Sequence, residues 1–220
     1  MDAMKPKGIW AGIVGPVLFV GVFLIEGWIR PGFSSSRLEV SALSLGPRGS
    51  IQILNFVITG SLFLLFSNGL TLLSSSRNGI WLVSRLLFLL GICLIFSGLF
   101  VMDPPNTPRD SWTIHGWVHQ LLGAVVFTIF PISCFLFWFL FRYELPWQRF
   151  RWWSFLAGCV LVLGIVCMKI GQLQPPNSFL ATRLGLFQRI ILVVYMGWVF
   201  AFAQRLDKVS ATTRQRLDQS

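Results

Sequence analysis

Long apolar runs separated by short polar segments dominate the chain. Each run is close to, or longer than, the roughly 20 residues that a helix needs to cross the hydrocarbon core of a bilayer. The pattern therefore predicts an all-α fold: a polytopic integral membrane bundle of six transmembrane helices, forming a single domain over residues 1–220. The predicted spans cover approximately residues 8–29, 51–73, 80–101, 113–141, 152–170 and 184–202.

The composition agrees with a membrane environment and argues against nucleic acid as a partner. Hydrophobic residues make up 55% of the 220 residues, charged residues make up 12%, and the mean hydropathy is +0.71. The net charge is +10, but the basic residues sit mostly in short loops and tails, where membrane orientation already accounts for them. Membrane lipids are therefore the predicted partners.

The distribution of lysine and arginine predicts how the bundle is oriented. Cytoplasmic loops of membrane proteins carry an excess of these residues. Eleven of the 18 lysines and arginines lie on the side of the two termini, which predicts a multi-pass plasma-membrane protein with cytoplasmic N- and C-termini. The eleven are Lys5, Lys7, Arg77, Arg85, Arg142, Arg149, Arg151, Arg205, Lys208, Arg214 and Arg216.

Polar and ionisable residues of the spans gather near the predicted outer surface. Residues 102–120 contain both histidines of the chain, and His115 and His119 share one helical face because they are four residues apart. Ionisable groups are costly within a bilayer, so they are candidates for function. Their scarcity in the middle of the spans argues against a continuous ion path and favours an outward-facing pocket. The candidate cluster comprises Glu26, Asp103, His115, His119, Gln188 and Arg189.

Divalent metal binding is one interpretation of this cluster. Two imidazoles and one carboxylate, from His115, His119 and Asp103, form a set that could bind a metal ion and activate water. In the simpler alternative, His115 lies at the level of the lipid headgroups and His119 forms a hydrogen bond to a neighbouring helix. No other cofactor is predicted. Haem is excluded because both imidazoles project from the same face of one helix and cannot ligate it from opposite sides.

Arg189 suggests either anion binding or ion pairing. An arginine near the end of a span can extend to lipid phosphate, but a guanidinium group also suits a phosphate or carboxylate ligand. Complementary polar groups in a narrow bundle should pair, so we expect Asp103, His119 and Arg189 to meet. A shielded ion pair between Asp103 and Arg189 would make the loss of Asp103 destabilising.

Two shorter motifs lie in the predicted outer loops. Ser36 and Glu39 have the spacing of a capping box, which predicts a short helix through Leu45 at the membrane surface. The tripeptide Pro-Pro-Asn occurs at residues 104–106 and again at 175–177, and a polar pair follows each copy in the next span. A duplicated hairpin, as in many transporters, and a chance match both agree with so short a repeat.

Further short motifs stand at the ends of the spans and in the first loop: Arg30-Pro31-Gly32-Phe33, residues 39–46, Gly60, Met102-Asp103-Pro104, residues 115–119 and Leu186-Phe187-Gln188-Arg189. Their order resembles that of the bacterial six-helix membrane proteins catalogued as domain of unknown function 998. The resemblance covers nearly the whole chain, implies a six-helix bundle, and implies no established activity. Either histidine could occupy the histidine position of that family, and we favour His119.

Two classes of function agree with these patterns. We favour a non-catalytic binding or accessory membrane bundle, whose partners could include other membrane protein subunits. The alternative is a membrane-embedded enzyme or lipid-handling protein that acts on a headgroup at the outer leaflet, including a metal-assisted hydrolase. A cavity around Asp103, His119 and Arg189 would support the alternative, whereas fully paired side chains without a cavity would support the first class.

Overall fold

The computed structural model describes residues 8–73 and 78–217 and confirms the predicted fold class. Six of its helices are long and apolar enough to cross a membrane. Lys5, Lys7 and Arg77, which contribute to the predicted orientation, lie outside the described residues. The six helices are α1 (Ile9–Ile29), α2 (Gly49–Leu73), α3 (Asn78–Leu99), α4 (Ile114–Leu140), α5 (Gln148–Leu173) and α6 (Leu184–Leu217).

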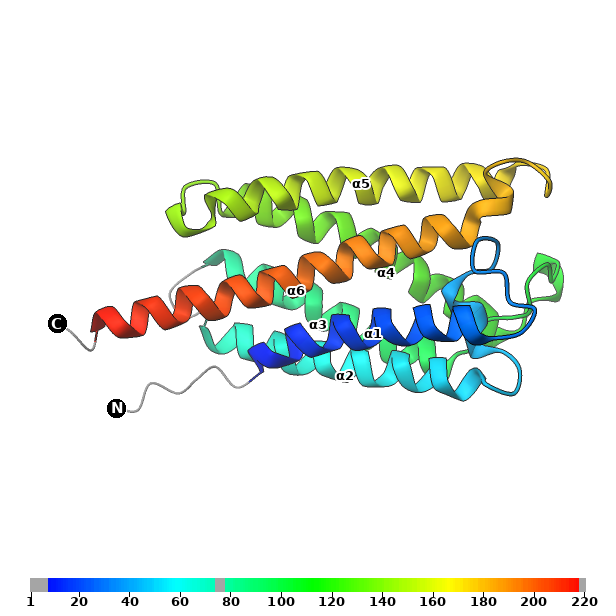
Figure 1. Ribbon diagram of the computed structural model, residues 1–220, viewed down its shortest axis with the longest axis horizontal. Coiled ribbons are helices and arrows are strands. Elements are labelled where there is room, and N and C mark those ends of the chain that lie inside the picture. The colour runs from blue at the N-terminus through cyan, green and yellow to red at the C-terminus, as the bar shows by residue number, and fades with distance from the viewer. Residues whose placement is uncertain (1–7, 74–77, 218–220) are drawn as a thin grey trace.

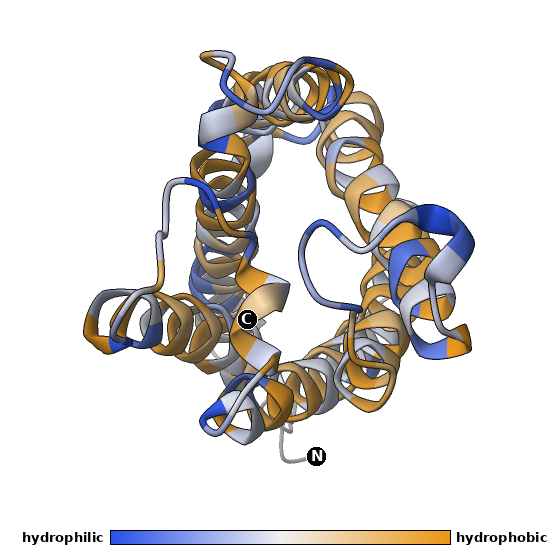
Figure 2. Ribbon diagram, turned by 90° about the vertical axis from the view of Figure 1, so that its right-hand side faces the viewer, coloured by the Kyte–Doolittle hydropathy of each residue, from blue (hydrophilic) through white to orange (hydrophobic). Residues whose placement is uncertain are grey.

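The six helices form a ring in chain order. Each helix packs against the next one, and α6 closes the ring by packing against α1 as well as α5. Figure 1 shows the bundle from the side, and Figure 2 shows the ring from one end. The connections α1–α2, α3–α4 and α5–α6 lie together at this end, here named the loop end. α1 begins and α6 ends at the opposite end, here named the terminal end.

Two helices extend beyond their predicted spans at the terminal end. α5 begins at Gln148 instead of near residue 152, and α6 continues to Leu217 instead of ending near residue 202. Outside the hydrocarbon core, water solvates polar side chains, so a helix needs no continuous apolar sequence there. Hydropathy therefore located the spans, but it did not mark where the helices end.

α2 and α3 approach each other closely at a pair of glycines. A Cβ atom added to Gly60 would lie 2.6 Å from the carbonyl oxygen of Gly91, and one added to Gly91 would lie 2.8 Å from the carbonyl oxygen of Gly60. A side chain at either position would force the helices apart. Because lipid provides no hydrophobic force between helices, such close packing stabilises the helix pair. α2 and α3 thus form a firm wall of the ring.

Aromatic side chains fill the ring toward the terminal end and form what we name the aromatic core. Phe137 of α4 lies at its centre and contacts rings from α5, α6 and the α4–α5 turn. Nearer the loop end, the Tyr195 ring stacks on Phe130, with the centroids 3.9 Å apart. These rings close the bundle on its terminal side. The aromatic core comprises Phe66, Phe130, Phe137, Phe141, Trp147, Phe150, Tyr195, Trp198 and Phe202.

The α1–α2 connection, residues 30–48 and here named loop 1, folds into the loop end of the ring. The predicted short helix is present as the 3₁₀ helix η1 (Val40–Ser44), with Glu39 at its N-cap position and no side-chain cap bond. The predicted capping box is therefore wrong: the Ser36 hydroxyl bonds to that of Ser34. η1 packs into the bundle, where Val40 and Leu43 are buried among α1, α2 and α6, and its place at the membrane surface stays a prediction.

Candidate functional site

Arg189 of α6 binds the backbone of loop 1. Its Nη1 lies 2.5 Å from the carbonyl oxygen of Ser35, 2.8 Å from that of Leu38 and 3.0 Å from that of Gly185. The guanidinium carbon also lies 5.8 Å from the centre of the Phe33 ring. The residue is only 7% exposed, so these carbonyl groups take the place of water around Nη1, whereas Nη2 is buried without a hydrogen-bond partner among the described residues. Arg189 thereby fixes loop 1 to α6.

The residues around Arg189 strengthen the attachment of loop 1 to α6. The backbone N–H of Val40 donates to Oε1 of Gln188, and the backbone N–H of Leu186 donates to the carbonyl oxygen of Ser36. Gly185 permits the close approach, since a Cβ atom there would lie 2.2 Å from the carbonyl oxygen of Leu38. The first turns of α6 are therefore built to hold loop 1.

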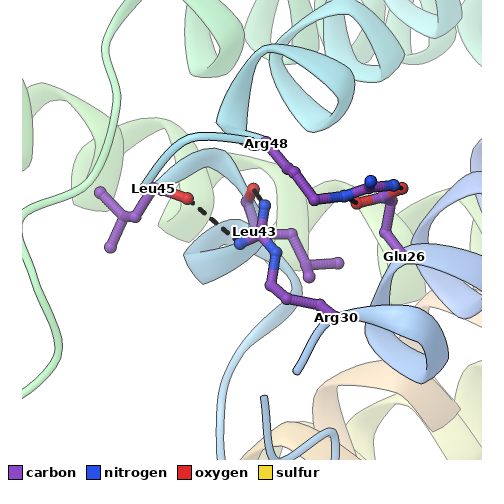
Figure 3. A network of polar contacts seen from close by, with 5 residues as sticks. All are labelled: Glu26, Arg30, Leu43, Leu45 and Arg48. Carbon is purple, nitrogen blue, oxygen red and sulfur yellow. Dashed lines mark hydrogen bonds and ion pairs between the residues drawn. The ribbon is translucent and has the colours of Figure 1, made fainter. Parts of the chain in front are cut away.

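Loop 1 is also fixed to α1, by the network in Figure 3. The guanidinium group of Arg48 donates to both carboxylate oxygens of Glu26, at 2.5 and 3.1 Å. Arg30, the C-cap residue of α1, donates to the carbonyl oxygens of Leu43 and Leu45, at 3.0 and 3.1 Å. Charged side chains that bind backbone carbonyls in this way satisfy the polar groups of a buried irregular segment.

The structure separates three residues that we expected to meet. Arg189 binds loop 1, Asp103 binds Thr113, and His119 binds the end of α3. Among the ion pairs of residues 8–73 and 78–217, Glu26–Arg48 is present and Asp103–Arg189 is not. The expected ion pair is therefore a wrong prediction. The backbone of loop 1, which sequence reasoning had not considered as a ligand for charged side chains, is the partner of Arg189.

Asp103 stabilises the start of α4. Its Oδ2 accepts a hydrogen bond from the backbone N–H of Thr113 at 2.9 Å, and its Oδ1 accepts one from the Thr113 hydroxyl at 2.8 Å. The Thr113 Oγ1 in turn accepts from the N–H of Gly116, as an N-cap residue does. A helix start without such partners would leave backbone donors unsatisfied. Asp103 thus acts through Thr113 on the geometry of the α3–α4 connection.

Replacing Gly116 with alanine is expected to break this cap. The added Cβ would collide with the carboxylate of Asp103, so the Asp103 side chain must move away from Thr113. We expect a loss of about 1–2 kcal/mol in the free energy of unfolding, the usual cost of a lost cap. Gly123→Ala is the matched control, because no atom lies within 4 Å of a Cβ added there. Equal melting temperatures of the two variants in detergent would contradict the assignment.

His119 is buried and faces a small cavity. Its Nδ1 lies 2.8 Å from the carbonyl oxygen of Phe100. Because a carbonyl oxygen can only accept, Nδ1 carries the proton of this hydrogen bond. The cavity has a volume of about 40 Å³, and Gln188 lines it together with His119. His115, by contrast, is exposed and its ring packs against Phe100, with the centroids 5.2 Å apart.

A larger cavity of about 530 Å³ opens at the loop end. All three connections of this end line it, and it includes residues of both Pro-Pro-Asn segments. Gly116 and Gln120 of α4 line this larger cavity, whereas His119 and Gly123 line the smaller one, which therefore lies deeper in the ring. The polar lining of the larger cavity consists of Arg37, Glu39, Asp103, Asn106, Thr107, Gln120, Gln172, Gln174, Asn177 and Thr182.

Glu39 is a site residue that sequence reasoning treated as part of a capping box and of the motif at residues 39–46, and not as a candidate for the site. It lines the larger cavity. Burial raises the pKa of Glu39 above its ordinary value of 4.5, and the nearby charge of Lys169 and a hydrogen bond with Gln172 offset this rise only in part. A spacing rule could not find it, because Lys169 and Gln172 belong to α5, far away along the chain.

Glu39→Gln is expected to stabilise the protein at neutral pH. A carboxyl group whose folded-state pKa is raised favours folding most when protonated, so its contribution is full at low pH and is lost as the pH rises through the folded-state pKa. Glutamine is neutral at every pH. We therefore expect a higher melting temperature than the parent at pH 7 and a difference that disappears toward pH 4.5. A constant difference across this range would contradict the pKa shift.

The three metal-ligand candidates are not gathered at one point. Within the described residues, no group of three or more His, Cys, Asp or Glu side chains could hold a metal ion. Asp103 is engaged with Thr113, His119 is buried, and His115 is exposed. The hypothesis of metal binding stays a prediction without support from this arrangement.

A comparison with protein families places the chain. A family model described as "Protein of unknown function (DUF998)" matches residues 13–205. No curated protein and no solved structure matches the chain. The matched region includes the residues of loop 1, both cavities and their attachments to α1, α4 and α6. Because the match extends over most of the chain, the protein belongs to this family of unknown function.

Proposed function

We propose that the protein is a non-catalytic binding protein of the membrane that holds a small polar molecule in its larger cavity. The single observation that carries this proposal is the cavity itself, about 530 Å³ in volume, lined by the three connections of the loop end. Ligand sites of proteins commonly have volumes of about 300–1,000 Å³. The aromatic core beneath closes the ring, so a ligand would enter and leave by the same end.

The lining favours a ligand that forms hydrogen bonds. Neutral amides from Gln120, Gln174 and Asn177 supply both donors and acceptors, and Trp112 supplies an aromatic surface. Of the two carboxyl groups, Asp103 is already bound to Thr113 and Glu39 interacts with Gln172. Hydroxyl and amide groups of a small molecule would match the amides that remain.

The arrangement of the candidate acid, base and anion holder supports binding over catalysis. An enzyme acting on a headgroup would need Asp103, His119 and Arg189 within reach of one substrate. Asp103 lines the larger cavity, His119 lines the deeper and smaller one, and Arg189 lines neither of them. The polar groups instead hold loop 1 and α4 in place, which preorganises the walls of the cavity.

A thermal-shift experiment tests this proposal. The purified protein in detergent would be melted with a panel of sugars, sugar alcohols, amino acids and glycerophosphodiesters. Ala181→Trp would fill the larger cavity, whose wall includes Ala181. Leu173→Trp is the matched control, because it adds the same ring at the same end at a site that is 88% exposed. We expect a stabilising compound to act on the parent and on Leu173→Trp but not on Ala181→Trp.

Two outcomes would count against the proposal. Equal stabilisation of Ala181→Trp and the parent would show that the compound binds elsewhere. Chemical conversion of the compound by the parent, detected by mass spectrometry, would favour the enzyme alternative. Binding of other membrane protein subunits stays a prediction.

We further propose that the protein lies in the plasma membrane. The mouth of the cavity then opens outside the cell, and both termini lie in the cytoplasm. Support comes from the excess of basic residues at the terminal end. Asn106→Cys in the α3–α4 connection, where residue 106 is exposed, should react with a membrane-impermeant thiol reagent added to intact cells. Labelling only after the membrane is broken would show that the protein has the opposite orientation.

A further inference from the structure

A cluster of arginine and tryptophan side chains lies at the terminal end, where α4 ends and α5 begins. The guanidinium carbon of Arg151 lies 5.8 Å from the centre of the Trp138 ring and 5.0 Å from that of the Trp152 ring. The Nη1 of Arg151 donates a hydrogen bond of 2.8 Å to the carbonyl oxygen of Arg142. These contacts, from two packed helices, hold the charge of Arg151 in one place.

Two N–H groups of this cluster have no acceptor. Among the described residues, the Arg151 Nε and the Trp138 indole nitrogen are both buried and without a hydrogen-bond partner. A buried donor without an acceptor raises the free energy of the folded state, and an acceptor from outside the chain would remove that cost. Since the cluster carries the charge of Arg151, an anionic acceptor fits it best.

The surroundings indicate where such an acceptor comes from. Trp152 and Trp153 are 53% and 65% exposed, as expected of rings in the headgroup region of a membrane. Arg205 adds a second cation. Its guanidinium is held at the same turn, because it donates two hydrogen bonds to the carbonyl oxygen of Pro146. Glu144 is the acidic residue between Arg142 and Trp153, so basic residues still outnumber acidic ones in this segment.

We propose that Arg151 and Trp138 bind the phosphate group of an anionic phospholipid at the terminal end of the bundle. The guanidinium group and the indole N–H donate to phosphate oxygens, and the exposed ring of Trp152 lies beside the upper part of the acyl chains. This site is separate from both cavities and is independent of the proposed function of the larger one.

Native mass spectrometry of the purified protein tests this site by lipid titration. The probes are phosphatidylglycerol, chain-matched phosphatidylcholine and soluble glycerol phosphate. We expect the parent to bind phosphatidylglycerol several-fold more tightly than phosphatidylcholine and to show no comparable binding of glycerol phosphate. Arg151→Gln should lose most of this preference. Trp138→Phe, which keeps an aromatic ring but removes the N–H, should lose part of it.

Arg149→Gln is the matched control, because it removes one positive charge from an exposed position two residues away. If Arg149→Gln and Arg151→Gln lose the preference for phosphatidylglycerol equally, the proposal is overturned, and the lipid is attracted by the overall positive charge of this segment. Binding of glycerol phosphate as strong as that of the lipid would overturn the lipid as the source of the phosphate. Arg151→Lys provides a second variant if Arg151→Gln does not fold. Lysine keeps the charge but lacks the planar fork of the guanidinium, so this variant should still bind phosphatidylglycerol more weakly than the parent. An unchanged affinity for phosphatidylglycerol would contradict the specific site.

Discussion

Arg189→Met is expected to lower the free energy of unfolding by about 3 kcal/mol, because it leaves backbone carbonyl groups of loop 1 without donors. The carbonyl oxygens of Ser35 and Leu38 both depend on the Nη1 of Arg189. Methionine is similar in length and apolar, so it fills part of the space but donates no hydrogen bond. Burying a charge carries its own cost, and the three carbonyl contacts of Nη1 and the Phe33 ring offset that cost in part, because Nη2 is buried without a partner.

Thermal melts in detergent would measure this loss, with two further variants for comparison. Arg189→Lys keeps the charge but not the planar fork, so its melting temperature should fall between those of the parent and Arg189→Met. Arg183→Met removes an arginine six residues earlier that bonds locally to Phe179 and Thr182, and it should cost much less. A melting curve of Arg189→Met that overlays the parent would argue for Arg189 as part of an open ligand site.

The sequence was sufficient to predict the spans because hydropathy is a local property. Each apolar run is long enough to cross a membrane, whatever the rest of the chain does. The same reasoning placed Glu26, Asp103, His119 and Arg189 near one end of the bundle. Their grouping at the loop end follows directly from the alternation of spans.

The partners of these residues could not be predicted in the same way. Arg189 binds carbonyl groups that lie more than 150 residues earlier in the chain, and carbonyl groups look alike at every position of a sequence. Favouring ion pairs over backbone acceptors led to the wrong partner for Asp103 as well. Its true partner, Thr113, is ten residues away, and the spacing of an aspartate ahead of a helix-capping threonine could have suggested it.

The burial of loop 1 was missed for a related reason. The segment from residue 30 to residue 48 contains serine, arginine and glycine, which are typical of exposed connections. The contacts made by Arg30, Gln188 and Arg189 show that its polar backbone is satisfied inside the ring. Charged residues at both ends of a loop can thus be read as anchors for that loop, as well as candidates for ligand binding.

The Glu26–Arg48 pair should respond unequally to the loss of its two members. Glu26 is 4% exposed, whereas the side chain of Arg48 is 47% exposed. Arg48→Met leaves a buried carboxylate without its main partner, and we expect it to lower the melting temperature by roughly 5 °C or more. Glu26→Gln leaves a guanidinium group that water and headgroups can solvate, so its effect should be clearly smaller.

The double variant, Glu26→Gln with Arg48→Met, tests whether the unpaired carboxylate of Glu26 causes the loss in Arg48→Met. It removes the buried charge together with its partner, so it should melt above Arg48→Met alone, although it contains one more substitution. Additive losses would instead mean that the two side chains act independently, and that Arg30 rather than the ion pair fixes loop 1 to α1. Arg30→Met would then be expected to produce the larger loss, since it removes the donors for the carbonyl groups of Leu43 and Leu45 and so frees η1 from the end of the ring.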